Sequence, residues 1–261
     1  MIYPSIKQIF RLFGYLILLV LLIGISLDII NKYTLKLDES IVNLVSYFIA
    51  NLVVSIRYLK KRKAANQDDY YIKSKKVSIS LLLFIIGLLL LFIVVIDPLE
   101  NLLPVPDWFL KIMSKVLSND IYSFVSVVIL APIFEELICR GIILDGFLKI
   151  YSPRKAILWS SLIFGLMHLN PWQFTGAFVG GLYIGWIYYR TQSIIPCMLI
   201  HSVYNLIAFL LYIYLPNYTL TKLLFDNKLY YFLVILISGG LLFWGIEILN
   251  AKIKSTHNTR S

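Results

Sequence analysis

Three ionisable residues, Glu135, Glu136 and Arg140, lie within six positions of an otherwise apolar stretch. Charged side chains cost roughly 2.5–3.5 kcal/mol each at the centre of a membrane helix, so such residues are usually paired and functional. Glu136 precedes Arg140 by four residues, which is the favourable order for an ion pair on one helix. Glu135 is rotated by about 100° from Glu136, and Cys139 occupies its own i+4 position. We therefore expect Glu135 to face other polar groups across a helix bundle.

The candidates for those groups are two of the chain's three histidines. His168 follows Phe164 by about one helical turn, and His201 precedes Asn205 by the same spacing. A lone histidine in an apolar helix is more often structural than functional. Two histidines, an asparagine and a Glu-Glu-Arg cluster on three separate apolar segments indicate instead a shared polar site within the membrane.

The depth of these residues allows such a site. Counted from the nearest basic residue on the expected cytoplasmic side, Glu135, His168 and His201 lie 14, 13 and 11 residues into their segments. At 1.5 Å per helical residue these distances are about 16–21 Å, which is close to the middle of a bilayer. The three side chains can therefore lie at one level.

The elements that must position these residues are membrane-spanning helices. The chain is 59% apolar and only 15% charged, whereas soluble domains carry about 25% charged residues. Its mean hydropathy is +0.81. Eight candidate spans cover about residues 12–30, 41–57, 77–96, 121–148, 155–169, 172–190, 193–214 and 229–250. The predicted fold is an all-α bundle of about eight transmembrane helices, forming one domain over residues 1–261.

The net charge of +10 has a distribution that indicates membrane orientation. Lysine and arginine lie between the apolar blocks, as in the cluster at residues 57–76, so we do not expect a nucleic-acid partner. If the N-terminus is cytoplasmic, most of these lysine and arginine residues lie on the cytoplasmic side of the membrane. We therefore predict a multi-pass cell-membrane protein with both termini in the cytoplasm. Residues 102–118 are too polar to span and are expected to form an interfacial helix on the outer face.

The three motifs resemble those of the CPBP family of intramembrane proteases, which is named after CAAX proteases and bacteriocin-processing enzymes and is also called Abi. The family pattern is EExxxR, FxxxH and HxxxN on successive helices. This chain has Glu135-Glu136-Leu-Ile-Cys-Arg140, Phe164-Gly-Leu-Met-His168 and His201-Ser-Val-Tyr-Asn205. Each motif alone is weak, but the three in this order are specific. The resemblance covers about residues 121–210, which would form the catalytic core.

The resemblance implies an intramembrane endopeptidase that cleaves a membrane-embedded or membrane-associated peptide or protein. Glu135 and His168 would bind and deprotonate a water molecule. His201 and Asn205 would donate hydrogen bonds to the developing oxyanion. The site-shaping residues would be the ion pair Glu136–Arg140 and the wall residue Phe164.

Metal use stays open at this point, because members of the family are often catalogued as metallopeptidases. Glu135, His168 and His201 would be the ligands if zinc is present. The HExxH pattern is absent, asparagine is a poor zinc ligand, and an arginine in the cluster opposes a dication. We therefore expect no cofactor and a metal-free attack by water.

The main alternative is a non-catalytic membrane protein that binds a partner, such as a scaffold or a bacteriocin self-immunity protein. Some relatives resemble this class. A transporter is a third reading, since buried charges also mark ion pathways. No GxSG or GxGD string supports a rhomboid or presenilin type of protease. The intact motifs favour the enzyme.

Overall fold

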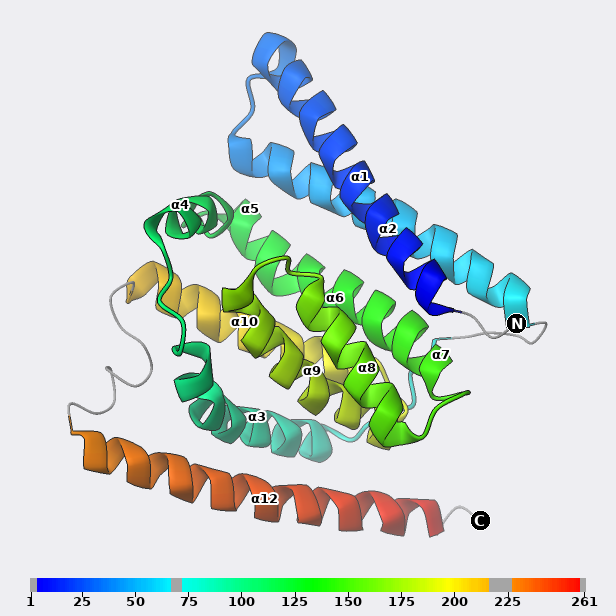
Figure 1. Ribbon diagram of the computed structural model, residues 1–261, viewed down its shortest axis with the longest axis vertical. Coiled ribbons are helices and arrows are strands. Elements are labelled where there is room, and N and C mark those ends of the chain that lie inside the picture. The colour runs from blue at the N-terminus through cyan, green and yellow to red at the C-terminus, as the bar shows by residue number, and fades with distance from the viewer. Residues whose placement is uncertain (1–3, 67–71, 216–226, 259–261) are drawn as a thin grey trace. The chain divides into compact units, whose positions relative to one another are not determined.

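The computed structural model describes residues 4–66, 72–215 and 227–258, with side chains as far as residue 252. Over these residues the secondary structure is helical, and the single β-type pairing is an isolated bridge between Ser74 and Ser193 (Figure 1). The predicted all-α fold class is therefore confirmed.

The chain divides into two compact units, each assembled from two stretches of sequence. Unit 1 comprises Met1–Lys73 and Val105–Ser160, and unit 2 comprises Ser74–Pro104 and Ser161–Ser261. The EExxxR motif belongs to unit 1, whereas the FxxxH and HxxxN motifs belong to unit 2. That the whole chain forms one domain stays a prediction.

Unit 1 begins with a helical hairpin (Figure 1). Its elements are α1 (Ile6–Ile30), the short π-helix η1 (Asn31–Leu35) and α2 (Glu39–Asn66). Ser5 and Gln8 form a capping box at the start of α1, in which each side chain accepts a hydrogen bond from the backbone of the other. Lys36 ends η1 in the left-handed conformation, with φ 53°. The chain then reverses, and α1 packs along α2.

The helical segment that carries the EExxxR motif is a composite of α-helical and π-helical turns. It consists of α5 (Ile121–Phe124), η2 (Val125–Leu130), α6 (Ala131–Glu136), η3 (Leu137–Leu144) and α7 (Asp145–Phe147). π-Helical turns are rare, and they occur frequently at functional sites. Both glutamates end α6, and Arg140 lies inside η3. The α2 helix packs against η2, α6 and η3 within unit 1.

The start of this composite helix is fixed by Asp120. Its carboxylate accepts hydrogen bonds from the amides of Tyr122 and Ser123 at 2.8 and 2.9 Å, as an N-cap does. The Ser40 hydroxyl, from the first turn of α2, donates to the same carboxylate at 3.0 Å. Desolvation raises the pKa of Asp120, but hydrogen bonds from Ser118, Ser123 and Ser40 outweigh it and lower that pKa from 3.8 to about 2.

The predicted interfacial helix is present as α4 (Asp107–Val116), immediately before this segment in unit 1. Trp108 is exposed and Phe109 is buried, so the helix has two unlike faces. The amphipathic helix is therefore observed, while its place at the outer face of a membrane stays a prediction.

Unit 2 is organised around α3 (Ile79–Glu100), which contacts α9 (Pro171–Thr191), α10 (Ile195–Tyr214) and α12 (Lys228–Asn258). The Tyr183 hydroxyl of α9 donates to the carbonyl of Ile85 at 3.0 Å. The Tyr183 ring stacks on Phe92 with centroids 4.9 Å apart. The short helix α8 (Pro153–Leu166) crosses from unit 1 into unit 2, and its last residues carry Phe164.

Five described helices are long and apolar enough to cross a membrane. They are Ile6–Leu35, Glu39–Ala65, Ile79–Glu100, Ile195–Tyr214 and Lys228–Lys252. The other three predicted spans also coincide with helical segments, namely the composite helix, α8 and α9. The composite helix is interrupted by π-turns, α8 has 14 residues, and α9 contains polar residues such as Gln173 and Arg190. The chain is a multi-pass helical membrane protein.

Candidate active site

Glu136 and Arg140 form a buried ion pair in unit 1. The Arg140 Nη1 donates to the Glu136 Oε1 at 2.7 Å, and the side chains are 1% and 0% exposed. The i, i+4 spacing places the two side chains on one face of the helix. Burial makes the pair interdependent, because removing one partner leaves the other charge unpaired in a low-dielectric interior.

Glu135 has a different environment from its neighbour. It is half-buried, and the Tyr47 side chain of α2 forms a hydrogen bond with it. The Tyr47 ring also meets Phe134 edge to face, with centroids 6.5 Å apart. The phenol is neutral, so this contact orients the Glu135 carboxylate without pairing it with a cation.

Tyr47 is a residue that the sequence reasoning missed. It lies far from the three motifs in the chain, in the second predicted span. A tyrosine in an apolar helix usually finds a hydrogen-bond partner when it is buried. That rule indicates a partner for Tyr47, but only the packing of α2 against α6 identifies Glu135.

In unit 2, His168 lies just beyond the end of α8 rather than inside a helix. The predicted span continues to residue 169, but α8 ends at Leu166 and a turn follows. Asn170 then caps α9, with Pro171 in its first turn. Leu169 has φ 56°, which is unusual for a branched residue. His168 therefore lies on a tight turn between two helices.

The hydrogen bond of His168 fixes which ring nitrogen can act as a base. Its Nδ1 lies 3.0 Å from the carbonyl oxygen of Phe164. A carbonyl oxygen can only accept, so Nδ1 must carry the proton. In the neutral ring Nε2 then holds the lone pair, as a general base or a hydrogen-bond acceptor requires.

Phe164 contacts both histidines of unit 2. Its ring lies edge to face with His168 at 5.3 Å and with His201 at 5.6 Å between centroids. Phe164 is buried, and His201 is 7% exposed. His201 and the half-buried Asn205 lie one turn apart on α10. The Phe164 ring thus joins the two imidazoles in one cluster, while its role as a wall of an active site stays a prediction.

The α9 helix packs closely against Phe164. A Cβ atom added at Gly181 would lie 3.1 Å from the Ser161 Cβ and 3.3 Å from the Phe164 Cδ1. Both distances are tighter than ordinary van der Waals contact. The absence of a side chain at Gly181 therefore lets α9 approach the end of α8.

The two units supply different chemical groups. Unit 1 offers a carboxylate, Glu135, beside a neutralised ion pair, and unit 2 offers His168, His201 and Asn205. Over the described residues, neither unit groups three His, Cys, Asp or Glu side chains as metal ligands would be. The polar groups of the two units are a carboxylate, two imidazoles and an amide. They suit proton transfer and hydrogen-bond donation to a developing negative charge.

Comparison with known proteins gives a match to one protein family. Residues 117–207 match the family described as Type II CAAX prenyl endopeptidase Rce1-like. The matched segment contains all three motifs, so the resemblance to CAAX-type proteases predicted from the sequence is confirmed over this segment. No curated protein and no solved structure matches the chain significantly.

Proposed function

Because residues 117–207 match a family of CAAX-type endopeptidases, we propose that this protein is an intramembrane endopeptidase. It hydrolyses a peptide bond of a membrane-embedded or membrane-associated peptide or protein. The observation that carries this proposal is the unequal state of two adjacent carboxylates. Glu136 is committed to Arg140, while Glu135 is partly accessible and is hydrogen-bonded by the neutral phenol of Tyr47.

In the proposed mechanism, Glu135 accepts a proton from a water molecule as the water oxygen attacks the scissile carbonyl carbon. His168 orients that water through Nε2, the nitrogen left as an acceptor by its bond to Phe164. His201 and Asn205 donate hydrogen bonds to the oxyanion of the tetrahedral intermediate. The C–N bond then breaks, and the proton held by Glu135 passes to the leaving nitrogen.

The proposal assigns no step to a metal. Zinc sites usually take their ligands from cysteine, histidine and carboxylate side chains, and an asparagine at position 205 serves better as a hydrogen-bond donor. We expect purified protein to keep its peptidase activity after exhaustive treatment with a strong chelator. Loss of activity that stoichiometric zinc restores would instead assign Glu135, His168 and His201 as ligands.

The deciding experiment is a proteomic comparison of strains that carry the wild-type protein or the Glu135→Gln variant. We expect specific membrane-associated peptides to accumulate uncleaved in the Glu135→Gln strain. The matched control is Glu39→Gln, the same change at an exposed carboxylate of unit 1, and it should leave the peptide pattern unchanged. Equal peptide patterns in all strains, with the variant present at normal levels, would favour a partner-binding protein.

The proposed orientation has both termini in the cytoplasm and α4 outside. A cysteine introduced at Asp107 should react with an impermeant thiol reagent in intact cells, whereas one at Lys63 should not. Both positions are exposed in the structure, and both native cysteines are buried. The reverse labelling pattern would mean that the protein has the opposite orientation in the membrane.

A further inference from the structure

Arg62 is the unexpected member of the basic cluster at residues 57–76. The charge distribution assigns it to the cytoplasmic side of the membrane, where a basic side chain is ordinarily exposed. Instead, Arg62 is fully buried at 0% exposure, while its neighbours Lys61 and Lys63 are exposed. Burying an arginine is unfavourable unless its donors are satisfied by acceptors. Its partners therefore indicate what the residue does.

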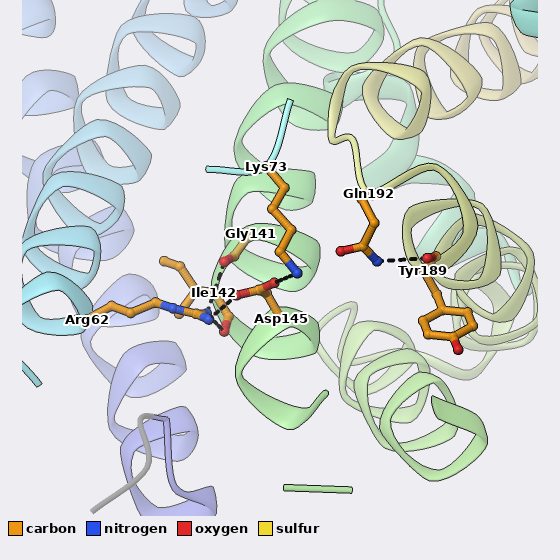
Figure 2. Close-up of polar contacts among 7 residues, drawn as sticks. All are labelled: Arg62, Lys73, Gly141, Ile142, Asp145, Tyr189 and Gln192. Atoms are coloured by element: carbon orange, nitrogen blue, oxygen red, sulfur yellow. Dashed lines mark hydrogen bonds and ion pairs between the residues drawn. The ribbon is translucent and has the colours of Figure 1, made fainter. Parts of the chain in front are cut away.

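Those partners all lie at the C-terminal end of the EExxxR helix, within unit 1. Arg62 Nη1 donates to the carbonyl of Gly141 at 3.0 Å and also to the carbonyl of Ile142. Arg62 Nη2 pairs with the Asp145 carboxylate. Lys73 reaches the other oxygen of Asp145 at 2.8 Å. Figure 2 shows Arg62 and Lys73 approaching Asp145 from different sides.

The two backbone contacts fall inside the π-helical segment η3. Gly141 directly follows the motif arginine, Arg140, and the return to α-helical bonding begins at Asp145. Where i→i+5 bonding gives way to i→i+4 bonding, the backbone carbonyls do not all keep an amide partner, and buried ones need another donor. The Arg62 guanidinium donates to two carbonyls just before this transition, those of Gly141 and Ile142, and the Ile142 carbonyl also accepts from the Asp145 amide.

A guanidinium suits this place better than an ammonium group. Arginine presents several N–H groups in a rigid planar fork, whereas lysine is a point charge on a flexible stem. Arg62 uses the fork to contact two carbonyls and one carboxylate together. Lys73, which pairs with the same carboxylate, has a 35% exposed side chain.

We propose that Arg62 is a positioning residue for the EExxxR motif. By holding the carbonyls of Gly141 and Ile142, it keeps η3 in its π-helical register. If a π-turn changed to an α-turn, one residue would leave the turn, and one end of the helix would rotate against the other by about 100°. Arg62 thereby sets the rotation of the helix end that carries Glu135 and Glu136 relative to the end that Arg62 and Asp145 anchor. Its effect on cleavage rests on the proposed function, but its effect on the helix does not.

The test uses a buried thiol inside η3 as a reporter that needs no substrate. Cys139 is 0% exposed and lies next to Arg140, and Cys197 is equally buried in α10 of unit 2. An Ala50→Cys change in α2 adds a third buried probe, in unit 1 but outside η3. The reactivity of each thiol toward a small maleimide is measured by mass spectrometry on the full-length protein in detergent.

With Arg62→Met, we expect Cys139 to react about tenfold faster while the probes at positions 50 and 197 stay unreactive, because loss of the contacts opens η3 locally. Arg62→Lys keeps the charge without the fork and should give an intermediate rate at Cys139. This conservative variant decides the question if Arg62→Met fails to fold. Lys63→Met removes an exposed charge from the next position and should change none of the three rates.

Two results would overturn the proposal. Equal acceleration at all three thiols, or at positions 50 and 139 together, would mean that Arg62 supports general packing. Unchanged Cys139 reactivity in folded Arg62→Lys would mean that the fork does not hold η3. Peptides that accumulate with Glu135→Gln should also accumulate with Arg62→Lys. If Glu135→Gln itself causes no accumulation, the proposed function fails, while the thiol rates still decide the role of Arg62.

Discussion

The polar clusters of the two units are built in different ways. Unit 1 buries full charges as ion pairs, such as Glu136–Arg140 at 2.7 Å. Unit 2 holds His168 and His201 against one aromatic ring, that of Phe164. A buried charge that loses its partner is strongly destabilising, whereas a polar group beside an aromatic ring can be truncated with a smaller effect. Substitutions in unit 1 should therefore reduce the amount of folded protein, and those in unit 2 should reduce turnover.

Glu135 should be the exception within unit 1, and it gives the largest expected effect. Glu135→Gln removes the base but keeps an oxygen that can accept a hydrogen bond from Tyr47. We expect turnover of an identified peptide to fall by about 10²–10⁴-fold, with no loss of thermal stability in detergent. If this variant unfolds while Glu136→Gln folds and loses turnover, the roles of the two glutamates are exchanged.

Glu136→Ala should show the behaviour typical of unit 1. The change leaves the Arg140 guanidinium buried without its carboxylate, which typically costs about 3–5 kcal/mol of folding free energy. The yield of folded protein and its melting temperature should fall together. The control is Glu39→Ala, which removes the exposed pair with Lys115 and should cost less than about 1 kcal/mol. Equal losses of folding free energy in both variants would contradict the expected difference between a buried and an exposed ion pair.

Asn205→Ala should show the behaviour typical of unit 2. Loss of one oxyanion donor should lower turnover by about 10²–10³-fold, with little change in expression or melting temperature. Ser202→Ala, a neighbouring change on the same helix but outside the motif positions, serves as the control and should keep normal turnover. An inactive phenotype that arises only from unfolding would place Asn205 with the structural residues.

The smallest expected effect concerns Asp120, at the start of the composite helix. Its pKa is lowered to about 2 in the folded protein from the ordinary value of 3.8. The stabilisation from its carboxylate is therefore complete above about pH 4 and is lost as the pH falls toward 2. Asp120→Asn keeps a capping oxygen but cannot titrate. The melting temperature of the wild type should fall more steeply than that of the variant between these pH values.

Much of this architecture can be predicted from the sequence because apolar runs and intramembrane charges have strong physical causes. The spacing of Glu136 and Arg140 predicts the ion pair that the structure contains. The predicted span 155–169 coincides with most of α8, which the structure ends at Leu166. The roles of Glu135, His168, His201 and Asn205 in catalysis stay predictions.

Other features depend on packing between segments that are distant in the chain. The π-turns of η2 and η3 have no signature in residue type, because their mostly apolar residues are equally compatible with α-helical turns. In the sequence, Arg62 is one more basic residue beside exposed lysines, and nothing in the pattern marks it as buried. Tyr47 likewise does not differ from the other tyrosines of the predicted spans. Both residues lie outside the segment that matches the family, so motif comparison also passes over them.

The small residue at Gly181 has a genetic consequence. Even one methyl group there would press on Ser161 and Phe164, and Phe164 contacts both imidazoles of unit 2. A Gly181→Ala allele would leave every motif residue in place yet disturb the wall behind them, and heating would amplify the defect. Position 181 is therefore suited to a temperature-sensitive allele, with which the physiological role of the protein can be switched off in a growing culture.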